Sequence, residues 1–202
     1  MVRIRRGLIR NFSVNSSGID IGGSNNPQVS FAPGATDWRI GGTSIYTDTL
    51  INISEFTNLF DQYKINGIYM QVDLPLGNSN AFAQPLYNPI IYYVADYDDS
   101  SDTDLGSLLQ YPQLQQHNFW RDCYTPLIIR LSPKPLRDIA GSGIATGYGP
   151  MAKAPWIRTA EMGVPHYGLK MCLDWFGITQ ATSMKMKITL WYDLSFTNPS
   201  IS

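Results

Sequence analysis

Charged side chains are scarce in this chain. Asp, Glu, Lys and Arg make up 15% of its 202 residues, against roughly 25% in typical soluble domains. Much of the surface must therefore be polar without charge. Such a surface can be buried against another protein without stranding ions, which are costly to bury unpaired. The scarcity of charge favours self-association, and the net charge of −1 gives the whole molecule no strong attraction to nucleic acid.

Histidine and cysteine are also rare, with two residues of each. His117 and His166 are too far apart for a two-histidine metal motif, which excludes cupin-type metal chemistry. Cys123 and Cys172 make no disulfide framework, so we predict buried free thiols, typical of a reducing compartment. No apolar run approaches the roughly 18 residues of a membrane span, and no signal peptide is recognisable. We expect no membrane partner.

The glycine-rich stretch 141–149 lacks the residues of a phosphate cradle. Thr146 stands where the dinucleotide fingerprint needs glycine, and no Gly-Lys-Ser/Thr follows. We predict a surface loop and no bound cofactor.

The acidic stretch 96–104 is the one candidate for chemistry. Asp96 and Asp98 are similar to the nucleophile-and-acid pair of aspartate phosphatases, which need a parallel sheet with flanking helices. As an EF-hand loop, the stretch has Ser101 in the glycine position and Ser107 in place of the terminal glutamate. We predict no catalytic or metal site here. Weak calcium binding at a subunit contact and a solvated loop both stay open.

The last strand-like segment, residues 184–196, indicates the fold class. Apolar residues alternate with polar ones throughout it, and only a strand sorts side chains onto two faces with a period of two. A strand this long needs a broad apolar surface to cover it, so the chain must consist of packed sheets. Further strand-like runs lie at residues 8–14, 28–31, 45–53, 68–74, 90–95, 125–131 and 169–175.

Helical spacing is confined to two short segments. Phe56, Leu59, Phe60 and Tyr63 recur as on one helix face, which predicts a helix over residues 54–64 with Ser54 as N-cap. Residues 105–109 predict one or two more helical turns. Roughly eight strands, two short helices in loops and no internal repeat predict an all-β, eight-stranded antiparallel jelly roll. No linker divides the chain, so we expect residues 1–202 to form one domain.

Basic residues gather at the start of the sequence. The first ten positions contain no acid and four arginines: Arg3, Arg5, Arg6 and Arg10. A frayed terminus and a phosphate-contacting arm both fit this pattern, and we predict a short basic arm remnant over residues 1–12. Trp191 lies on the polar face of the last strand, where it could stack on a sugar or base or pack at an interface.

Four segments in order resemble one protein family. Residues 56–68 (FTNLFDQYKINGI), 92–99 (YYVADYDD), 111–112 (YP) and 131–135 (LSPKP) resemble capsid proteins of small circular Rep-encoding single-stranded DNA viruses, the circovirus-like group. The likeness covers roughly residues 45–196. No single motif is specific to the family, and their order and spacing together carry the resemblance.

The resemblance implies a structural capsid protein and no enzyme. It would self-assemble into a small (T=1) icosahedral shell around a circular single-stranded DNA genome, as part of a virion, with a stage in the host nucleus and a host receptor that the sequence does not identify. In that family the sheet with the last strand faces the lumen. The residues implied to meet DNA are Arg3, Arg5, Arg6, Arg10, Lys185 and Lys187. For the two lysines, a solvated strand face is the plainer interpretation.

One departure from the family concerns positive charge. These capsid proteins usually begin with a long arginine-rich arm that packages DNA and carries a nuclear import signal. Here the first residues hold only four arginines and the net charge is −1. Either a longer arm has been removed or packaging relies on local patches, because enclosing DNA requires cations on the protein.

Two other functions are left open by the residues alone. A carbohydrate-binding β-sandwich with exposed Trp and Tyr predicts tryptophan fluorescence that responds to a glycan. A phosphatase built on Asp96 and Asp98 predicts magnesium-dependent turnover that Asp96→Asn abolishes. Particle formation separates the capsid hypothesis from both.

Overall fold

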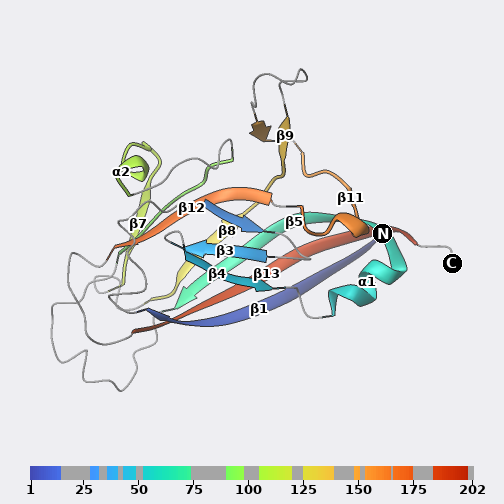
Figure 1. Ribbon diagram of the computed structural model, residues 1–202, viewed down its shortest axis with the longest axis horizontal. Coiled ribbons are helices and arrows are strands. Elements are labelled where there is room, and N and C mark those ends of the chain that lie inside the picture. The colour runs from blue at the N-terminus through green and yellow to red at the C-terminus, as the bar shows by residue number, and fades with distance from the viewer. Residues whose placement is uncertain are drawn as a thin grey trace.

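Two antiparallel sheets form the body of the protein in the computed structural model (Figure 1). The structure describes residues 1–14, 28–31, 36–40, 43–48, 52–73, 90–97, 105–119, 125–138, 148–150, 153–164, 166–174 and 184–199.

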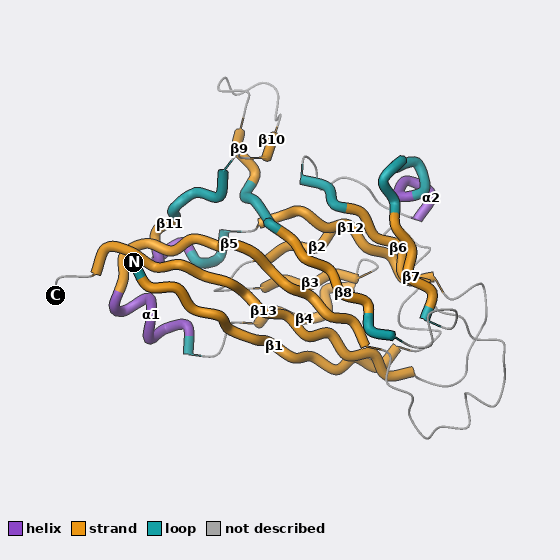
Figure 2. The backbone as a smooth tube through the Cα atoms, turned by 180° about the vertical axis from the view of Figure 1, so that it is seen from behind, coloured by secondary structure: helices purple, strands orange, loops and turns teal. Residues whose placement is uncertain are grey.

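The longer sheet, which we call sheet A, has the order β1-β13-β5, with β8 and the short β11 both paired to the far edge of β5. Its strands are β1 (Val2–Val14), β13 (Met184–Pro199), β5 (Phe60–Asp73), β8 (Leu127–Leu131) and β11 (Ile157–Arg158). Seen from behind in Figure 2, the four longer strands run side by side across the molecule. The predicted last strand is therefore confirmed as a central strand of the fold.

Sheet B has the order β2-β12-β6-β7. Its strands are β2 (Gln28–Phe31), β12 (His166–Asp174), β6 (Ile90–Val94) and β7 (Gln115–Asn118). Apart from β11, the chain enters sheet A with β1, β5, β8 and β13 and sheet B with β2, β6, β7 and β12. These repeated crossings between two sheets are the topology of a jelly roll, and they confirm the predicted all-β fold.

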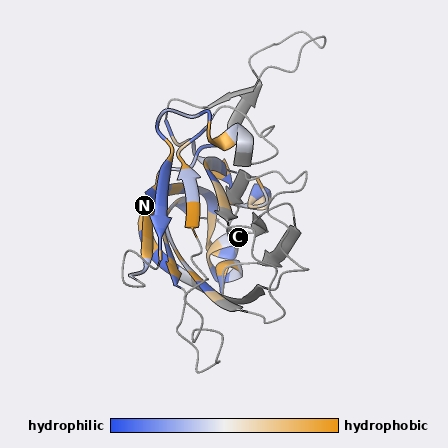
Figure 3. Ribbon diagram, turned by 90° about the vertical axis from the view of Figure 1, so that its left-hand side faces the viewer, coloured by the Kyte–Doolittle hydropathy of each residue, from blue (hydrophilic) through white to orange (hydrophobic). Residues whose placement is uncertain are grey.

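The core fills the space between the inner faces of the two sheets. Sheet A contributes Met70, Ile188 and Leu190, and sheet B contributes Leu169 and Met171 to the same buried cluster. Figure 3 shows hydrophobic and hydrophilic residues interleaved along the strands that it colours by hydropathy. This alternation lets each strand bury one face and leave the other face for different partners.

Shorter elements lie outside the two sheets. Two separate ribbons pair β3 (Thr36–Ile40) with β4 (Thr43–Asp48) and β9 (Leu136–Asp138) with β10 (Tyr148–Pro150). Among the described residues, the helical elements are α1 (Ile53–Leu59), α2 (Leu105–Leu108) and the single-turn η2 (Thr159–Glu161). No helix among the described residues has the length and apolar character needed to cross a bilayer.

The helix predicted over residues 54–64 is only half right. α1 ends at Leu59, and Phe60 begins β5, which pairs with β13 as far as Pro199. The N-cap is Asn52 in the left-handed region (φ 59°) and not Ser54, and Asn tolerates this conformation better than most residues. Phe56 and Phe60 still reach the core, since both rings lie against Phe196 at 5.2 and 5.9 Å between centroids.

The first residues of the chain belong to sheet A. From Val2 to Val14, every residue of β1 pairs with β13. The arginines of this segment are therefore held on a strand and do not extend from the fold as an arm. Strand alternation then separates them onto two faces of the sheet.

Candidate nucleic-acid interface

The outer face of sheet A is organised in rows that cross the strands. Antiparallel partners point to the same face of a sheet, so the register places Gly7, Trp191, Tyr69 and Arg130 in one row across β1, β13, β5 and β8. The residues that alternate with this row, such as Leu190, are buried in the core. The row therefore faces away from the core.

Two aromatic rings form the centre of this face. Tyr69 and Trp191 lie edge to face, with 5.0 Å between their ring centroids. The guanidinium carbon of Arg5 lies 5.7 Å from the centroid of Tyr69 and 5.8 Å from that of Trp191. On the other side, Arg130 lies 5.8 Å from the Tyr69 centroid. These distances are within the range of cation–π attraction, so the two arginines hold the rings in place.

Gly7 makes room for the indole of Trp191. A Cβ atom added at Gly7 would meet Cδ1 of Trp191 at 3.2 Å and Nε1 at 3.4 Å. The indole therefore leans from β13 over the backbone of β1. A larger residue at position 7 would require the ring to shift by a few tenths of an ångström.

Asp193 is the main acid on the described part of this face, and its charge is already engaged. Nε of Arg3 donates to Oδ1 of Asp193 at 2.8 Å, and NH2 of Arg3 forms a second bond to Oδ2. Asn66 also donates to Oδ1, at 3.3 Å. The hydrogen bond from Arg3 and, more weakly, that from Asn66 lower the pKa of Asp193. The carboxylate therefore stays charged well into acid, with Arg3 as its bonded cation.

Further cations extend the charge along the sheet. Lys64 pairs with Ser195 in the register, and its ammonium lies 6.0 Å from the ring centroid of Trp156. At the far end, Lys187 stands opposite Asp73. We call this surface the basic face, and its described cations are Arg3, Arg5, Lys64, Arg130, Arg158 and Lys187. In a chain of net charge −1, the described side chains of this face carry a clear positive excess over Asp73 and Asp193.

The six basic residues predicted from the sequence do not all meet. Arg3, Arg5 and Lys187 lie on the basic face. Arg6 pairs with the buried Tyr192, and its guanidinium lies 5.2 Å from the ring of Phe56 under α1. Its Nε is buried without a hydrogen-bond partner. Because Arg6 alternates with Arg5 along β1, it packs on the opposite side of the sheet.

The remaining two predicted residues are described only by their backbone positions. Arg10 stands opposite Ile188 and Lys185 opposite Ser13 in the β1–β13 register. Their side chains lie outside the described part of the structure.

Three central members of the face were not singled out from the sequence: Tyr69, Arg130 and Lys64. Tyr69 lies between apolar residues of its predicted strand, and Arg130 lies between apolar residues of the strand predicted over residues 125–131. The sequence therefore predicts the two strands, but it does not predict that these distant strands pair. Register alone brings them together.

A second ionic cluster lies on sheet B and is buried. Nζ of Lys170 lies 2.5 Å from Oδ2 of Asp96, and the exposed fractions of the two side chains are 0% and 7%. The hydroxyl of Tyr111 donates to the same carboxylate oxygen at 2.8 Å and accepts from Lys170 at 2.8 Å. Asp96 is thus enclosed and neutralised, so the phosphatase hypothesis loses its open nucleophile.

The other site predictions have mixed outcomes. Asp98 and the rest of the acidic loop to residue 104 lie outside the described residues. Within the described ranges, no group of three or more His, Cys, Asp or Glu is arranged to hold a metal ion. Cys172 is buried and belongs to no disulfide, as predicted, and Cys123 is outside the described residues.

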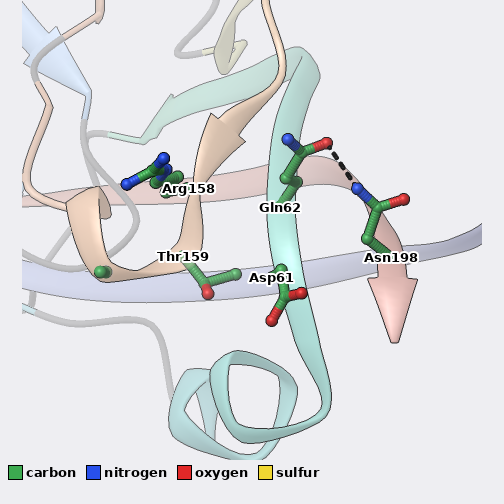
Figure 4. Close-up of a pocket in the computed structure, with 6 residues that line it drawn as sticks. Asp61, Gln62, Arg158, Thr159 and Asn198 are labelled. Carbon is green, nitrogen blue, oxygen red and sulfur yellow. Dashed lines mark hydrogen bonds between the residues drawn. The ribbon is translucent and has the colours of Figure 1, made fainter. Parts of the chain in front are cut away.

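A hollow lies where β5, β11 and the end of β13 meet (Figure 4). In it, Asn198 donates to the side-chain oxygen of Gln62 at 3.2 Å. Thr159 donates to the carbonyl of Phe60 at 2.9 Å. These bonds join the strand ends to one another, and Arg158 is the cation of the lining. The hollow adjoins the end of the basic face, but its lining also contains the acid Asp61, and it defines no separate site.

Comparison with known proteins agrees with this architecture. A family model described as circovirus capsid protein matches residues 2–200. No curated protein sequence matches the chain. The crystal structure of the 60-mer BFDV capsid protein is 16% identical, with a TM-score of 0.62 over 98% of this chain and 97% of that one. The decameric BFDV capsid protein is also 16% identical, with a TM-score of 0.53 over 98% and 99%.

At this identity, the two solved structures support the jelly-roll fold alone. The family match is broader evidence, because it spans nearly the whole chain from β1 to the end of β13. The chain belongs to the circovirus capsid protein family, and its role is that of a structural component of the virion shell.

Proposed function

We propose that this capsid protein, as one jelly-roll domain, assembles with copies of itself into a small icosahedral shell that encloses a circular single-stranded DNA genome. In that shell, the basic face of sheet A lines the interior and contacts the DNA. The observation that carries the proposal is the gathering of Arg5 and Arg130 around Tyr69 and Trp191, with Arg3 two residues from Arg5 on the same sheet face.

Local charge matters more than net charge for this role. Charges on a protein surface are screened over about 10 Å at 0.1 M salt. DNA phosphates near the basic face would therefore experience its cations and little of the acidic residues elsewhere. Binding of cations to phosphates also releases counterions, which favours association at low salt.

Assembly would rely on many modest contacts between copies. Leu59 at the end of α1 and Leu109 after α2 expose 59% and 58% of their surface, on parts of the molecule outside the basic face. Their burial against neighbouring copies would remove apolar surface from water. Asymmetric contacts that close under rotation generate finite assemblies, and multivalency makes each weak contact sufficient. The BFDV relative, crystallised as a 60-mer, is consistent with this kind of assembly.

Assembly is tested with the full-length purified chain. Size-exclusion chromatography and negative-stain electron microscopy should show round particles of uniform diameter. After nuclease treatment, their ultraviolet absorbance should retain the contribution of protected nucleic acid. A monomer at high concentration across salt and pH would contradict the shell, and empty particles would contradict the enclosed DNA.

The role of the basic face is tested separately with charge variants. Arg5→Gln combined with Arg130→Gln should weaken binding to a DNA oligonucleotide, and the slope of its salt dependence should fall by about one for each phosphate that the protein no longer neutralises. The control is Lys134→Gln, because Lys134 lies over Tyr97 and bridges to Tyr167 beside sheet B. The control removes one positive charge and the double variant removes two, so the losses of affinity are compared per charge. An equal loss per charge would contradict a special role for this face.

A further inference from the structure

We propose that the row formed by Trp191 and Tyr69 is a base-stacking platform, through which the basic face prefers unpaired nucleic acid to a duplex. This inference rests on the proposed function of the face and adds a mode of recognition to it. Charge alone attracts any phosphate backbone, whereas stacking requires bases that are free of partners.

The two rings have no role in the core that would explain them. Tyr69 and Trp191 are half-buried and lie on the outer side of sheet A, opposite the inner apolar layer. Their neighbours in the next row are the polar Gln71 and Thr189, with the exposed Ile9 and Ile128 at the two ends of that row. Rings and aliphatic side chains are unnecessary on a strand face that meets only water, which favours a ligand with a flat apolar surface.

The cations around the rings suit a nucleotide. Arg5 and Arg130 are exposed, and each has its guanidinium within 6 Å of the centre of a ring. In the absence of ligand, each guanidinium covers a ring face by cation–π attraction. A phosphate can draw such a guanidinium into a charge-assisted hydrogen bond, and the uncovered ring face then accepts the adjoining base.

Gly7 supports the same arrangement from β1. The indole of Trp191 leans over this residue, and no side chain from position 7 stands above the ring. The edge strand therefore adds no side chain over the ring at this position. Arg5 lies two residues away on the same strand, so its guanidinium and the indole are neighbours.

Selection for single strands follows from what each form of DNA presents. In a duplex, the bases are stacked on one another inside the helix and only the backbone and groove edges reach a flat surface. In a single strand, each base can leave its neighbours and stack on a protein ring, with a gain of about 1–3 kcal/mol per base. The platform therefore favours the unpaired form even where the charge density of the duplex is greater.

The test compares three DNA probes of equal length on purified subunits kept dissociated: a thymidine strand, an abasic strand with the same phosphates, and a duplex. With the wild type, we expect the thymidine strand to bind at least about tenfold more tightly than the abasic strand, as one stacked base implies. Trp191→Leu combined with Tyr69→Leu should abolish this difference while leaving the salt dependence unchanged.

Two controls separate stacking from folding and from charge. Trp191→Phe retains a ring at this position. It should therefore keep part of the preference for the thymidine strand over the abasic strand that the double leucine variant loses. Arg5→Gln should weaken binding of the thymidine and abasic strands alike and lower the salt dependence. Near-ultraviolet circular dichroism of each variant establishes that the jelly roll is intact.

The outcomes distinguish this inference from the proposed function. If the wild type binds the thymidine and abasic strands equally and the leucine variant changes neither, the stacking platform is wrong while the basic face stands. If the wild type binds none of the three probes at low salt, the proposed function of the face is itself wrong. Tighter binding of the duplex than of the thymidine strand would also overturn the stacking inference.

Discussion

Sheets A and B each carry an ion pair on the side away from the shared core, in opposite environments. On sheet A, Arg3 bonds to Asp193 on a surface where the Arg3 side chain is 67% exposed. On sheet B, Lys170 bonds to Asp96 with almost no exposure of either side chain. The same chemistry therefore appears once in water and once inside the protein.

The environment decides what each pair can do. An exposed pair is screened by water and salt and contributes little to stability, so its groups can exchange partners when a charged ligand arrives. A buried pair has lost its hydration, and each ion depends on the other. Sheet A therefore presents charges for binding, while sheet B uses charges to hold Asp96, Tyr111 and β12 together.

The largest effect should follow from removing one member of the buried pair. Lys170→Met leaves the Asp96 carboxylate buried without its cation, and we expect the free energy of unfolding to fall by about 3–5 kcal/mol. Urea denaturation of dissociated subunits measures this change. A decrease below that seen for an exposed lysine variant such as Lys153→Met would show that the pair is in contact with water.

The matched double variant sharpens the same comparison. Adding Asp96→Leu to Lys170→Met removes both charges, and apolar replacement of a buried pair is often neutral or stabilising. We therefore expect the double variant to recover much of the stability that the single variant lacks. Additive decreases would instead show that the two residues act independently.

A smaller decrease is expected for Tyr111→Phe. The substitution keeps the ring, which lies 5.2 Å from the ammonium of Lys170, and removes the hydroxyl that bonds to both ions. Hydrogen bonds to charged groups contribute about 1.5–3 kcal/mol. The change is measured by urea denaturation, with Tyr69→Phe on the exposed sheet A as control. Equal decreases in the two variants would contradict the difference between the sheets.

The sequence predicts the strands that bury one apolar face and fails for elements that lack this pattern. Alternation in residues 184–196 identified β13, because a buried inner face imposes a period of two. β7 was missed, because Gln115–Asn118 contains only polar residues and shows no alternation. The helix was extended too far, because the spacing of Phe56, Phe60 and Tyr63 fits a helix face, whereas the ladder with β13 makes the last two residues strand.

Contacts between distant segments were beyond reach for a different reason. Lys170 alternates with Leu169 and Met171, and by pattern alone it resembles a lysine in water. Only the folded chain shows that Tyr111 and Asp96 cover it. Arg6 and Arg5 are neighbours in sequence, yet strand alternation places one under Phe56 and the other above Tyr69. Sequence composition locates the charges, and pairing register determines their faces.

Acid should weaken sheet B through His166. Burial lowers the pKa of this imidazole, with hydrogen bonds to the carbonyls of Val164 and Phe31 opposing the shift. The folded state then binds fewer protons than the unfolded chain, whose histidine titrates near about 6.5. Stability is fully present above that value and falls as the pH drops below it. Thermal unfolding between neutral pH and pH 5 measures this decrease, and His166→Gln should remove this part of the dependence.

The smallest change in stability is expected at the exposed pair, where the effect on binding should be the larger one. Asp193→Asn frees Arg3 from its carboxylate partner and removes an anion beside Arg5. The pKa of Asp193 is lowered in the folded protein, so its contribution to stability is present above its ordinary value and is lost only as strong acid protonates it. Near neutral pH, screening by water keeps that contribution small.

We therefore expect nearly unchanged urea denaturation of Asp193→Asn together with tighter, more salt-dependent binding of a DNA oligonucleotide. Arg3→Gln should have the opposite effect on binding and an equally slight effect on unfolding. If Asp193→Asn instead destabilised the subunit as much as Lys170→Met, sheet A would be held by its charges as sheet B is, and Arg3 would be unavailable to a phosphate.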